Sequence, residues 1–435
     1  MNGQNLWNKA KKIIPGGNML LSKRAEMFLP DIWPAYFDKA SGCEVWDLDN
    51  NKYFDMCIMG IGTNTLGYGN KEVDEAVFEA ITKGNMSTLN CPEEVKLAEK
   101  LVEINPWAEM VRFARTGGEA NSIAVRIARS ASGKDGVAFC GYHGWHDWYL
   151  SANLNDKKNL DTHLLKDLST NGIPKKLKNT VFPFEYNNYE QLKKICKNND
   201  IGVIKMEVFR NFAPSNNFLK KVKNLANKKN IVLIFDECTS GFRETLGGLH
   251  KKYKIEPDIC ILGKALGNGY PITAVIGKKE VMKHASSSLI SSTFWTDRIG
   301  FIAALKTLSE MERKKSWKMI SQIGGLIKKK WKMIAKKNKL KIKISGLSAC
   351  PSFYIPSSNW LKYKTLITQY MLEKNYLATN TVYVSTEHKN KKILNKYFTF
   401  LDEVFKKIKN CENKIDNIDS LLKTDTCQST FKRLN

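Results

Sequence analysis

Short apolar runs alternate with longer helical patterns through the middle of the chain. This alternation predicts β-strands separated by α-helices, as in a mostly parallel sheet with helices on both faces. The runs that we expect to form strands are 110–114, 136–140, 202–207, 231–236, 259–262 and 273–277. The pattern therefore predicts an α/β fold.

The two ends of the chain follow other patterns. Residues 45–55 read as two β runs around a polar turn, which predicts a hairpin. After about Glu310, long basic helical patterns and short strands indicate a separate C-terminal domain. We find no internal repeat.

The composition is that of a soluble globular protein. The chain has 435 residues, of which 43% are hydrophobic, enough for two domains with large cores. No apolar run approaches the roughly 20 residues of a membrane helix, and the N-terminus lacks a signal-like segment, so we expect a cytoplasmic protein without membrane contact. The ten cysteines show no C-x-x-C pair and no Cys/His cluster at zinc spacing, so we expect neither disulfides nor a metal site.

The formal net charge of +26 raises the alternative of a polyanion-binding protein. The lysines are spread over many segments, however, and the densest run, 328–343, alternates with apolar residues as a solvated helix and strand would. No nucleic-acid-binding motif accompanies them. We therefore expect no nucleic-acid partner.

Ionisable residues stand where three of the expected strands end. Glu207 and Asp236 close two strands, and Lys264 follows a third. In an open α/β sheet, ligands bind outside the carboxyl ends of the strands, so these side chains should converge. A lysine amine can form a Schiff base with the aldehyde of pyridoxal phosphate, and a carboxylate can hold the pyridine nitrogen protonated. The spacing favours such a site.

Two further segments follow strands and could complete it. The turn 115–121 contains Gly117 and Gly118 and opens a helix, so its amides and the helix dipole favour a phosphate. In the loop 141–147, Tyr142 could stack on a pyridine ring, and His143 could hydrogen-bond close by. For Trp145, His146 and Trp148 we expect packing on the core.

Together these segments resemble the class III, ornithine-type aminotransferases, in particular the branch that contains glutamate-1-semialdehyde 2,1-aminomutase. The resemblance runs from about Trp46 to Ala304. The motifs that carry it are 45–49, 116–120, 142–144, Asp236-Glu237 with 241–243, 263–267 and 292–294.

The resemblance implies a fold-type I transferase that binds pyridoxal 5'-phosphate. Its large domain, expected at 61–310, would contain a mostly parallel seven-stranded sheet. A smaller α+β domain would combine segments 1–60 and 311–435. The resemblance also implies a homodimer with shared active sites.

The same resemblance implies roles for individual residues. Lys264 would form the Schiff base and shuttle the proton, Asp236 would pair with the ring nitrogen, and Tyr142 would stack on the ring. Other implied cofactor contacts are Gly117 and Gly118 to the phosphate, His143 and Glu207 near the ring, and Thr293 to the phosphate of the neighbouring subunit.

Some positions depart from the family. The second residue of the phosphate turn is usually Ser or Thr, whereas this chain has Gly118. The segment 377–385 lacks the aminomutase's glutamate, and no arginine that could hold a substrate carboxylate occurs between Arg313 and Arg433. Arg24, in a segment that resembles the aminomutase's substrate-arginine segment, is either the carboxylate partner or a structural arginine. Arg243 is expected to be structural.

These observations favour an aminotransferase that moves an amino group from a small-molecule donor to a carbonyl acceptor. The alternative is glutamate-1-semialdehyde 2,1-aminomutase, because transfer within one molecule uses the same residues. A non-catalytic protein that keeps the fold is the third hypothesis.

Overall fold

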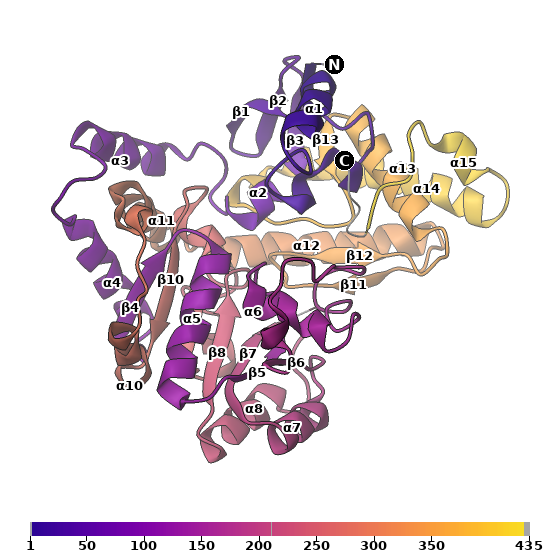
Figure 1. Ribbon diagram of the computed structural model, residues 1–435. Coiled ribbons are helices and arrows are strands. Elements are labelled where there is room, and N and C mark those ends of the chain that lie inside the picture. The colour runs from indigo at the N-terminus through magenta and orange to yellow at the C-terminus, as the bar shows by residue number, and fades with distance from the viewer. Residues whose placement is uncertain (1, 210, 430–435) are drawn as a thin grey trace. The chain divides into compact units, whose positions relative to one another are not determined.

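The computed structural model describes residues 2–209 and 211–429 (Figure 1). The chain divides into two compact units. The large unit is the continuous segment Lys71–Lys318, and the small unit combines Met1–Asn70 with Met319–Asn435. That the large unit binds the cofactor is a prediction, which the division into two units does not test.

A seven-stranded sheet forms the centre of the large unit, with the strand order β4-β10-β9-β8-β7-β5-β6. Strands β6, β5, β7, β8 and β9 are parallel, whereas β10 is antiparallel to both of its neighbours. The strands are β4 Met110–Ala114, β5 Gly136–Cys140, β6 Val181–Pro183, β7 Ile201–Glu207, β8 Val232–Glu237, β9 Ile259–Leu262 and β10 Thr273–Gly277. The predicted α/β fold with a mostly parallel sheet is confirmed.

The central strands are apolar without alternation because both faces of this sheet are covered. Every residue of β5, β8, β9 and β10 is buried. Helix α5 (Gly117–Ser132) covers one face (Figure 1) and buries Ile123, Ala124 and Ile127 there. Its last turn ends at Gly133, which has a φ of 67° and so takes the left-handed conformation that glycine tolerates best.

The large unit contains eight further helices among its described residues. They are α3 Lys71–Thr82, α4 Pro92–Ile104, α6 Asp147–Leu150, α7 Tyr189–Asn198, α8 Phe218–Lys228, α9 His250–Tyr253, α10 Lys279–Met282 and α11 Arg298–Lys314. Short 3₁₀ turns are η3 Ser151–Leu154, η4 Lys175–Leu177, η5 Lys264–Gly267, η6 Lys283–Ser287 and η7 Thr293–Thr296. Helix α11 packs on α3 and α4.

The small unit contains a four-stranded sheet of order β1-β2-β3-β13 and a β11-β12 pair. The predicted hairpin is confirmed, since β2 and β3 are antiparallel and the Asp47 carboxylate accepts the amide N–H groups of Asp49 and Asn51 in the turn. The strands are β1 Phe37–Ser41, β2 Glu44–Asp47, β3 Lys52–Met56, β11 Lys343–Ser345, β12 Ser352–Tyr354 and β13 Tyr376–Ala378.

Two long basic helices, α12 and α14, cover a core that includes the buried rings of Trp331, Tyr363, Tyr376 and Tyr397. The helical segments of this part of the chain are α1 Asn2–Ile13, η1 Leu21–Lys23, η2 Ala25–Met27, α2 Met59–Gly62, α12 Ser316–Lys337, α13 Trp360–Glu373, η8 Thr386–Lys389, α14 Lys391–Glu412 and α15 Ile418–Leu421. Among the described residues, no helix is both long enough and apolar enough to cross a membrane.

Candidate functional site

Three strand ends of the large unit bring the predicted polar residues to one edge of the sheet. Glu207 and Asp236 are direct partners in the β7-β8 ladder. Lys264 follows the neighbouring strand β9, and its Nζ donates a 2.7 Å hydrogen bond to Oγ1 of Thr239. The backbone of Lys264 has a φ of 45°, in the left-handed region that non-glycine residues seldom adopt. Such strain is typical of functional positions.

Asp236 is buried and carries a stabilised negative charge. Its Oδ2 lies 2.8 Å from Nδ1 of His143, and its Oδ1 accepts the amide N–H of Cys238 at 3.1 Å. Burial raises the pKa of this carboxyl, but the hydrogen bond with His143 and the nearby charge of Lys205 outweigh burial and hold the pKa well below its usual range. The site therefore contains a fixed anion.

His143 lies between two hydrogen-bond acceptors. Nδ1 faces the ionised Asp236 carboxylate, which can only accept, so a ring proton belongs there. Nε2 lies 3.2 Å from the carbonyl oxygen of Cys140, which also can only accept. Burial lowers the pKa of the ring, against the opposing effect of Asp236, and so disfavours the doubly protonated form that would donate to both acceptors.

Lys205 is a charged neighbour that the sequence analysis missed. It lies in the middle of β7, two residues before Glu207, so the strand's alternation directs it to the same face of the sheet as Asp236. The side chain is fully buried, and its Nζ has no hydrogen-bond partner among the described residues. Burial lowers its pKa to about 8. Only its position inside an otherwise apolar strand could have identified it.

Tyr142 and Glu207 are joined through the backbone. The amide N–H of Tyr142 donates to Oε2 of Glu207 at 3.3 Å. Gly141 before it has a φ of 117°, and a Cβ at that position would collide with the Glu207 carboxylate, so only glycine fits. The Tyr142 ring is 41% exposed and meets Tyr149 edge-on at 6.2 Å between centroids. It is therefore accessible for stacking.

The expected phosphate turn is the N-terminus of α5. Thr116 caps the helix: its hydroxyl accepts the Glu119 amide, and the Glu119 carboxylate accepts the Thr116 amide. Gly117 and Gly118 are the first two residues of the helix, where no carbonyl of the same helix can accept their amide N–H groups. Those groups are the natural donors for an anion.

The segment that contains Thr293 is tied to this turn. The Arg115 guanidinium donates to both carboxylate oxygens of Asp297, at 3.1 and 2.9 Å, and the Trp295 indole N–H donates to Glu119 at 3.2 Å. Thr293 itself is exposed in η7. Its contact with a neighbouring subunit stays a prediction.

Two arginines have different surroundings. Arg243 is fully buried, and its Nε donates to the carbonyl oxygen of Thr239, in line with a structural role. Arg24 belongs to the small unit, where it is buried and its guanidinium lies against Gly16. Its expected role as the carboxylate partner stays a prediction.

The expectation of core packing is right for Trp148 and wrong for Trp145. Trp148 is 7% exposed and donates its indole N–H to Ser122 at 3.2 Å, whereas Trp145 is 69% exposed. The loop turns at Gly144, which has a φ of 96°, and this turn carries Trp145 out of the core. His146 is half-buried.

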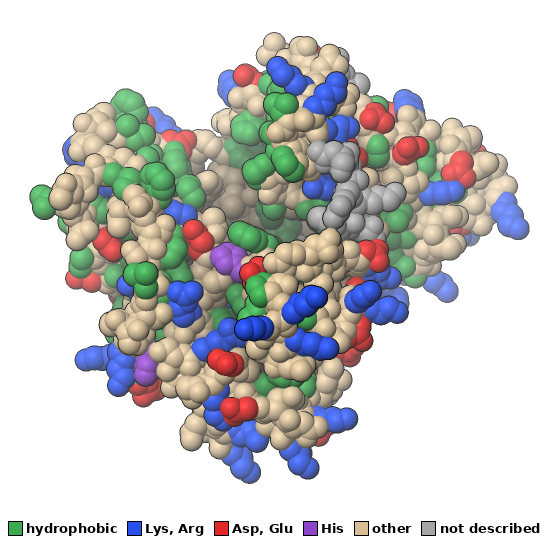
Figure 2. Space-filling model, in the orientation of Figure 1, with side chains coloured by type: hydrophobic (Ala, Val, Ile, Leu, Met, Phe, Trp, Pro, Cys, Tyr) green, Lys and Arg blue, Asp and Glu red, His purple; other side chains and the backbone are tan. Residues whose placement is uncertain are grey.

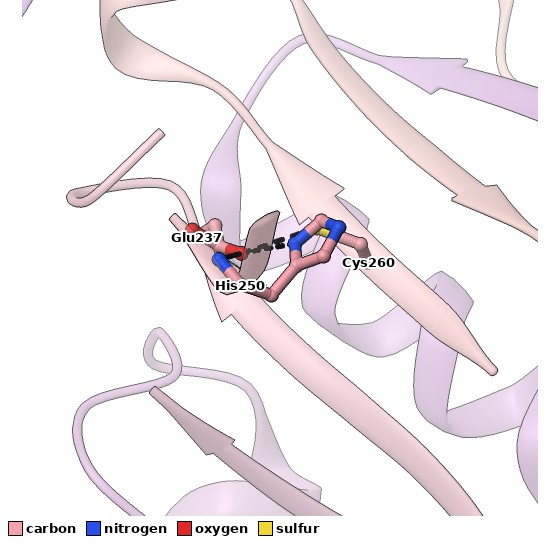
Figure 3. A group of neighbouring side chains, drawn as sticks. All are labelled: Glu237, His250 and Cys260. Carbon is pink, nitrogen blue, oxygen red and sulfur yellow. Dashed lines mark hydrogen bonds and ion pairs between the residues drawn. The ribbon is translucent and has the colours of Figure 1, made fainter. Parts of the chain in front are cut away.

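Glu237, His250 and Cys260 form a buried cluster with side chains of the types that bind metals (Figure 3). The Trp107 indole N–H donates to Nε2 of His250 at 2.8 Å, which leaves the ring proton on Nδ1, 2.6 Å from the Glu237 carboxylate. That carboxylate also accepts the amide N–H groups of Leu249 and His250 and the hydroxyl of Ser240. A cation would have to break these bonds, so the cluster works as a hydrogen-bonded support for β8.

The residues present fit pyridoxal 5'-phosphate. The site offers a lysine amine, a carboxylate that stays ionised and two glycine amides at a helix N-terminus. Each matches one part of the cofactor: its aldehyde, its ring nitrogen and its phosphate.

Comparisons with known proteins agree with this fit. Residues 30–369 match the family "Aminotransferase class-III". The chain is 33% identical over 393 residues to 3-aminobutyryl-CoA aminotransferase of Cloacimonas acidaminovorans, covering 88% of this chain and 90% of that protein. It is 36% identical over 327 residues to glutamate-1-semialdehyde 2,1-aminomutase of Nitrosopumilus maritimus, covering 72% and 74%.

A solved structure has the same fold. The FumI protein of Sphingopyxis sp. MTA144, in its form with pyridoxal phosphate attached, superposes with a TM-score of 0.85 at 21% identity. The match covers 97% of this chain and 99% of that protein.

Proposed function

The chain belongs to the class III aminotransferases, which are enzymes that depend on pyridoxal 5'-phosphate, and we propose that its catalytic centre is the strand-end site of the large unit. The enzyme moves an amino group between a small-molecule donor and a carbonyl acceptor. The observation that carries the site is the placement of Lys264 and Asp236 after neighbouring strands, with Asp236 ionised and buried.

The bound cofactor supplies an electron-poor ring that stabilises negative charge on the substrate carbon. Asp236 holds the ring nitrogen in its protonated form, and His143 keeps the Asp236 carboxylate oriented. The Lys264 Nζ would hold the cofactor at its aldehyde and, when free, would take the proton from the substrate carbon and return it. Thr239, 2.7 Å from Nζ, positions this amine.

Three further contacts complete the proposed site. The exposed ring of Tyr142 would hold the cofactor ring by stacking, and Glu207 fixes the Tyr142 loop through its bond to the amide N–H. The amides of Gly117 and Gly118 bind the phosphate. Arg24 receives a substrate carboxylate.

Between the two reactions of this branch, we propose transfer to a second molecule. Segment 377–385 lacks the aminomutase's glutamate, which supports transfer over internal exchange. Both kinds of enzyme occur among the relatives, so the distinction rests on these departures.

We also propose a cytoplasmic homodimer. Exposed apolar side chains gather over α3, α4 and the loop between them (Figure 2), namely Phe78, Ile81, Met86, Leu89 and Val95. A group of this kind on a soluble protein marks an interaction surface, and a second copy of the chain is the partner that the family suggests. No disulfide joins the described cysteines, which supports a reducing compartment.

Lys264→Ala tests the proposal. Borohydride should attach the cofactor to Lys264 in the wild type, as read by peptide mass spectrometry, and to no residue in the variant. A panel of amino donors should convert the wild-type cofactor to its amine form, as followed by absorbance, and the variant should lose nearly all turnover while its thermal unfolding midpoint stays similar. Attachment at another lysine would contradict the assignment.

A further inference from the structure

The loop after β5 lies directly on the first turn of α5. A Cβ added to Gly144 would lie 2.9 Å from the Cα of Gly118. The two backbones therefore touch, and the side chains that follow Gly144 have little freedom to move away from the turn. Those side chains are Trp145 and His146.

Their ring nitrogens occupy the place of the side chain that position 118 does not have. A Cβ built on Gly118 would lie 3.2 Å from Nε2 of His146 and 3.4 Å from Nε1 of Trp145. The two rings are 4.6 Å apart between centroids. Within the described parts of the chain, neither nitrogen makes a hydrogen bond.

The carboxylate of the neighbouring residue, Glu119, already accepts hydrogen bonds on both of its oxygens. Glu119, also in the first turn, accepts the backbone N–H groups of Arg115 and Thr116 on one oxygen and the Trp295 indole on the other. These bonds offset the effect of burial and lower its pKa, so it stays ionised and turned to those donors. The remaining groups around Gly118 are N–H donors: two helix amides, an indole and an imidazole.

We propose that Trp145 and His146 bind the cofactor phosphate, from the side on which a hydroxyl at position 118 would stand. This inference rests on the proposed function, which assigns the phosphate to the α5 turn. A phosphate dianion is satisfied by donors alone, and an indole N–H can only donate. Burial lowers the pKa of the His146 ring, and Nε2 donates to the phosphate in the tautomer that carries the proton there.

The test compares two cofactor forms that differ only in the phosphate. Dissociation constants of pyridoxal 5'-phosphate and of pyridoxal are measured on the apoenzyme of the wild type, Trp145→Phe and His146→Ala. Because a hydrogen bond to a charged group is lost, each variant should bind the phosphorylated form roughly 10- to 100-fold more weakly. Pyridoxal affinity should not change, and Trp148→Phe, whose indole bonds Ser122, should match the wild type.

Moving the donor from position 146 to position 118 provides the second measurement of phosphate affinity. In the wild type, Gly118→Ser crowds the His146 ring and should weaken phosphate binding. In His146→Ala the same change has room and restores a donor, so it should recover most of the lost affinity.

If the variants lose affinity equally for pyridoxal and for its phosphate, or if Gly118→Ser does not restore affinity in His146→Ala, the two rings only pack the loop. Either result would overturn the inference. A wild-type enzyme that attaches neither form to Lys264 would instead overturn the proposed function. The two failures are therefore distinguishable.

Discussion

At the scale of single residues, the site is a small set of buried charges that depend on one another. Asp236 is held ionised by the hydrogen bond from His143 and by the nearby charge of Lys205. Lys205 is the member that costs stability, because its ammonium is fully buried and has no hydrogen-bond partner in the part of the chain that the structure describes. A buried ionisable group with a perturbed pKa is typical of an active site.

Lys205→Met should stabilise the protein in a pH-dependent way. The folded state lowers the pKa of Lys205 from 10.5 to about 8, so the unfolded chain binds the proton more tightly. The penalty is full below pH 8, where it amounts to roughly 3 kcal/mol, and it disappears as the pH rises toward 10.5. Urea unfolding of both proteins between pH 7 and pH 10 measures the difference.

A constant difference across that pH range would mean that Lys205 binds its proton equally tightly in the folded and unfolded chain, so that folding does not lower its pKa. The matched control is Lys223→Met, because Lys223 is paired with Asp258 at 2.9 Å near the surface of the same unit. That variant should not be more stable than the wild type.

Asp236→Asn should keep the cofactor and lose the reaction. Removing a close charge moves the pKa of its partner by about 1 to 3, so single-turnover proton abstraction should fall by roughly one to three orders of magnitude. Stopped-flow absorbance with a good amino donor measures the rate, and borohydride attachment at Lys264 confirms loading. A near-normal rate would show that another group protonates the ring.

The sequence could predict which polar residues follow strands and gather at one edge of the sheet, because a polar residue stands out where an apolar run ends. Asp236, Glu207 and Lys264 are of this kind. Thr239 and Lys205 could not be assigned in the same way. The position of Thr239 beside Lys264 depends on a turn that joins distant segments, and the orientation of Lys205 depends on strand pairing.

At the scale of elements, the end of β8 is fixed from both faces of the sheet. Asp236 points to the face on which His143 lies, and the next residue, Glu237, points to the opposite face because side chains alternate. There Glu237 is held by His250, which in turn accepts from Trp107. This network supports β8 from behind and so holds Asp236 in place.

Trp107→Phe should weaken that support. It leaves the buried Nε2 of His250 without its donor, which should cost about 1 to 3 kcal/mol. The urea unfolding midpoint should fall while the slope of the transition stays constant. With all proteins unfolded without cofactor, Trp145→Phe, at an exposed tryptophan of the same unit, is the control for the loss of an indole. An unchanged midpoint would mean that water replaces the indole.

Six strands of the large sheet were predicted from apolar runs, and β6 was not. It spans only Val181–Pro183 at the edge of the sheet, too short to give a run and with a proline that interior strands avoid. A short edge strand becomes ordered because it pairs with the neighbouring strand. The pairing of β13 with β3 was equally invisible, since it joins residues about 320 positions apart.

At the scale of the whole molecule, the excess of basic residues is a property of the surface and leaves the site unchanged. Lysine and arginine number 69 against 43 acids, and many lysines of α12 and α14 face away from the core. We propose transfer to a second molecule because segment 377–385 lacks the aminomutase's glutamate.

Glutamate-1-semialdehyde supplied alone to the amine form of the enzyme tests this preference. We expect 5-aminolevulinate to form at least tenfold more slowly than product forms from a matched donor and acceptor, a difference of about 1.4 kcal/mol in the barrier. Arg24→Ala should lower the affinity only for amino donors that carry a carboxylate. Sustained 5-aminolevulinate production without a second substrate would establish the mutase instead.

The small unit is built from the two ends of the chain, and this affects how the protein emerges from the ribosome. The large unit is continuous and can fold as it is made, whereas β3 lacks its parallel neighbour β13 until Tyr376–Ala378 has been synthesised. At about 5 to 20 residues per second, that interval is roughly 15 to 60 seconds. During this interval, Trp7 and the other apolar residues of the first 70 positions lack the packing partners that the C-terminal part of the small unit supplies. This exposure would favour the binding of a chaperone to the segment.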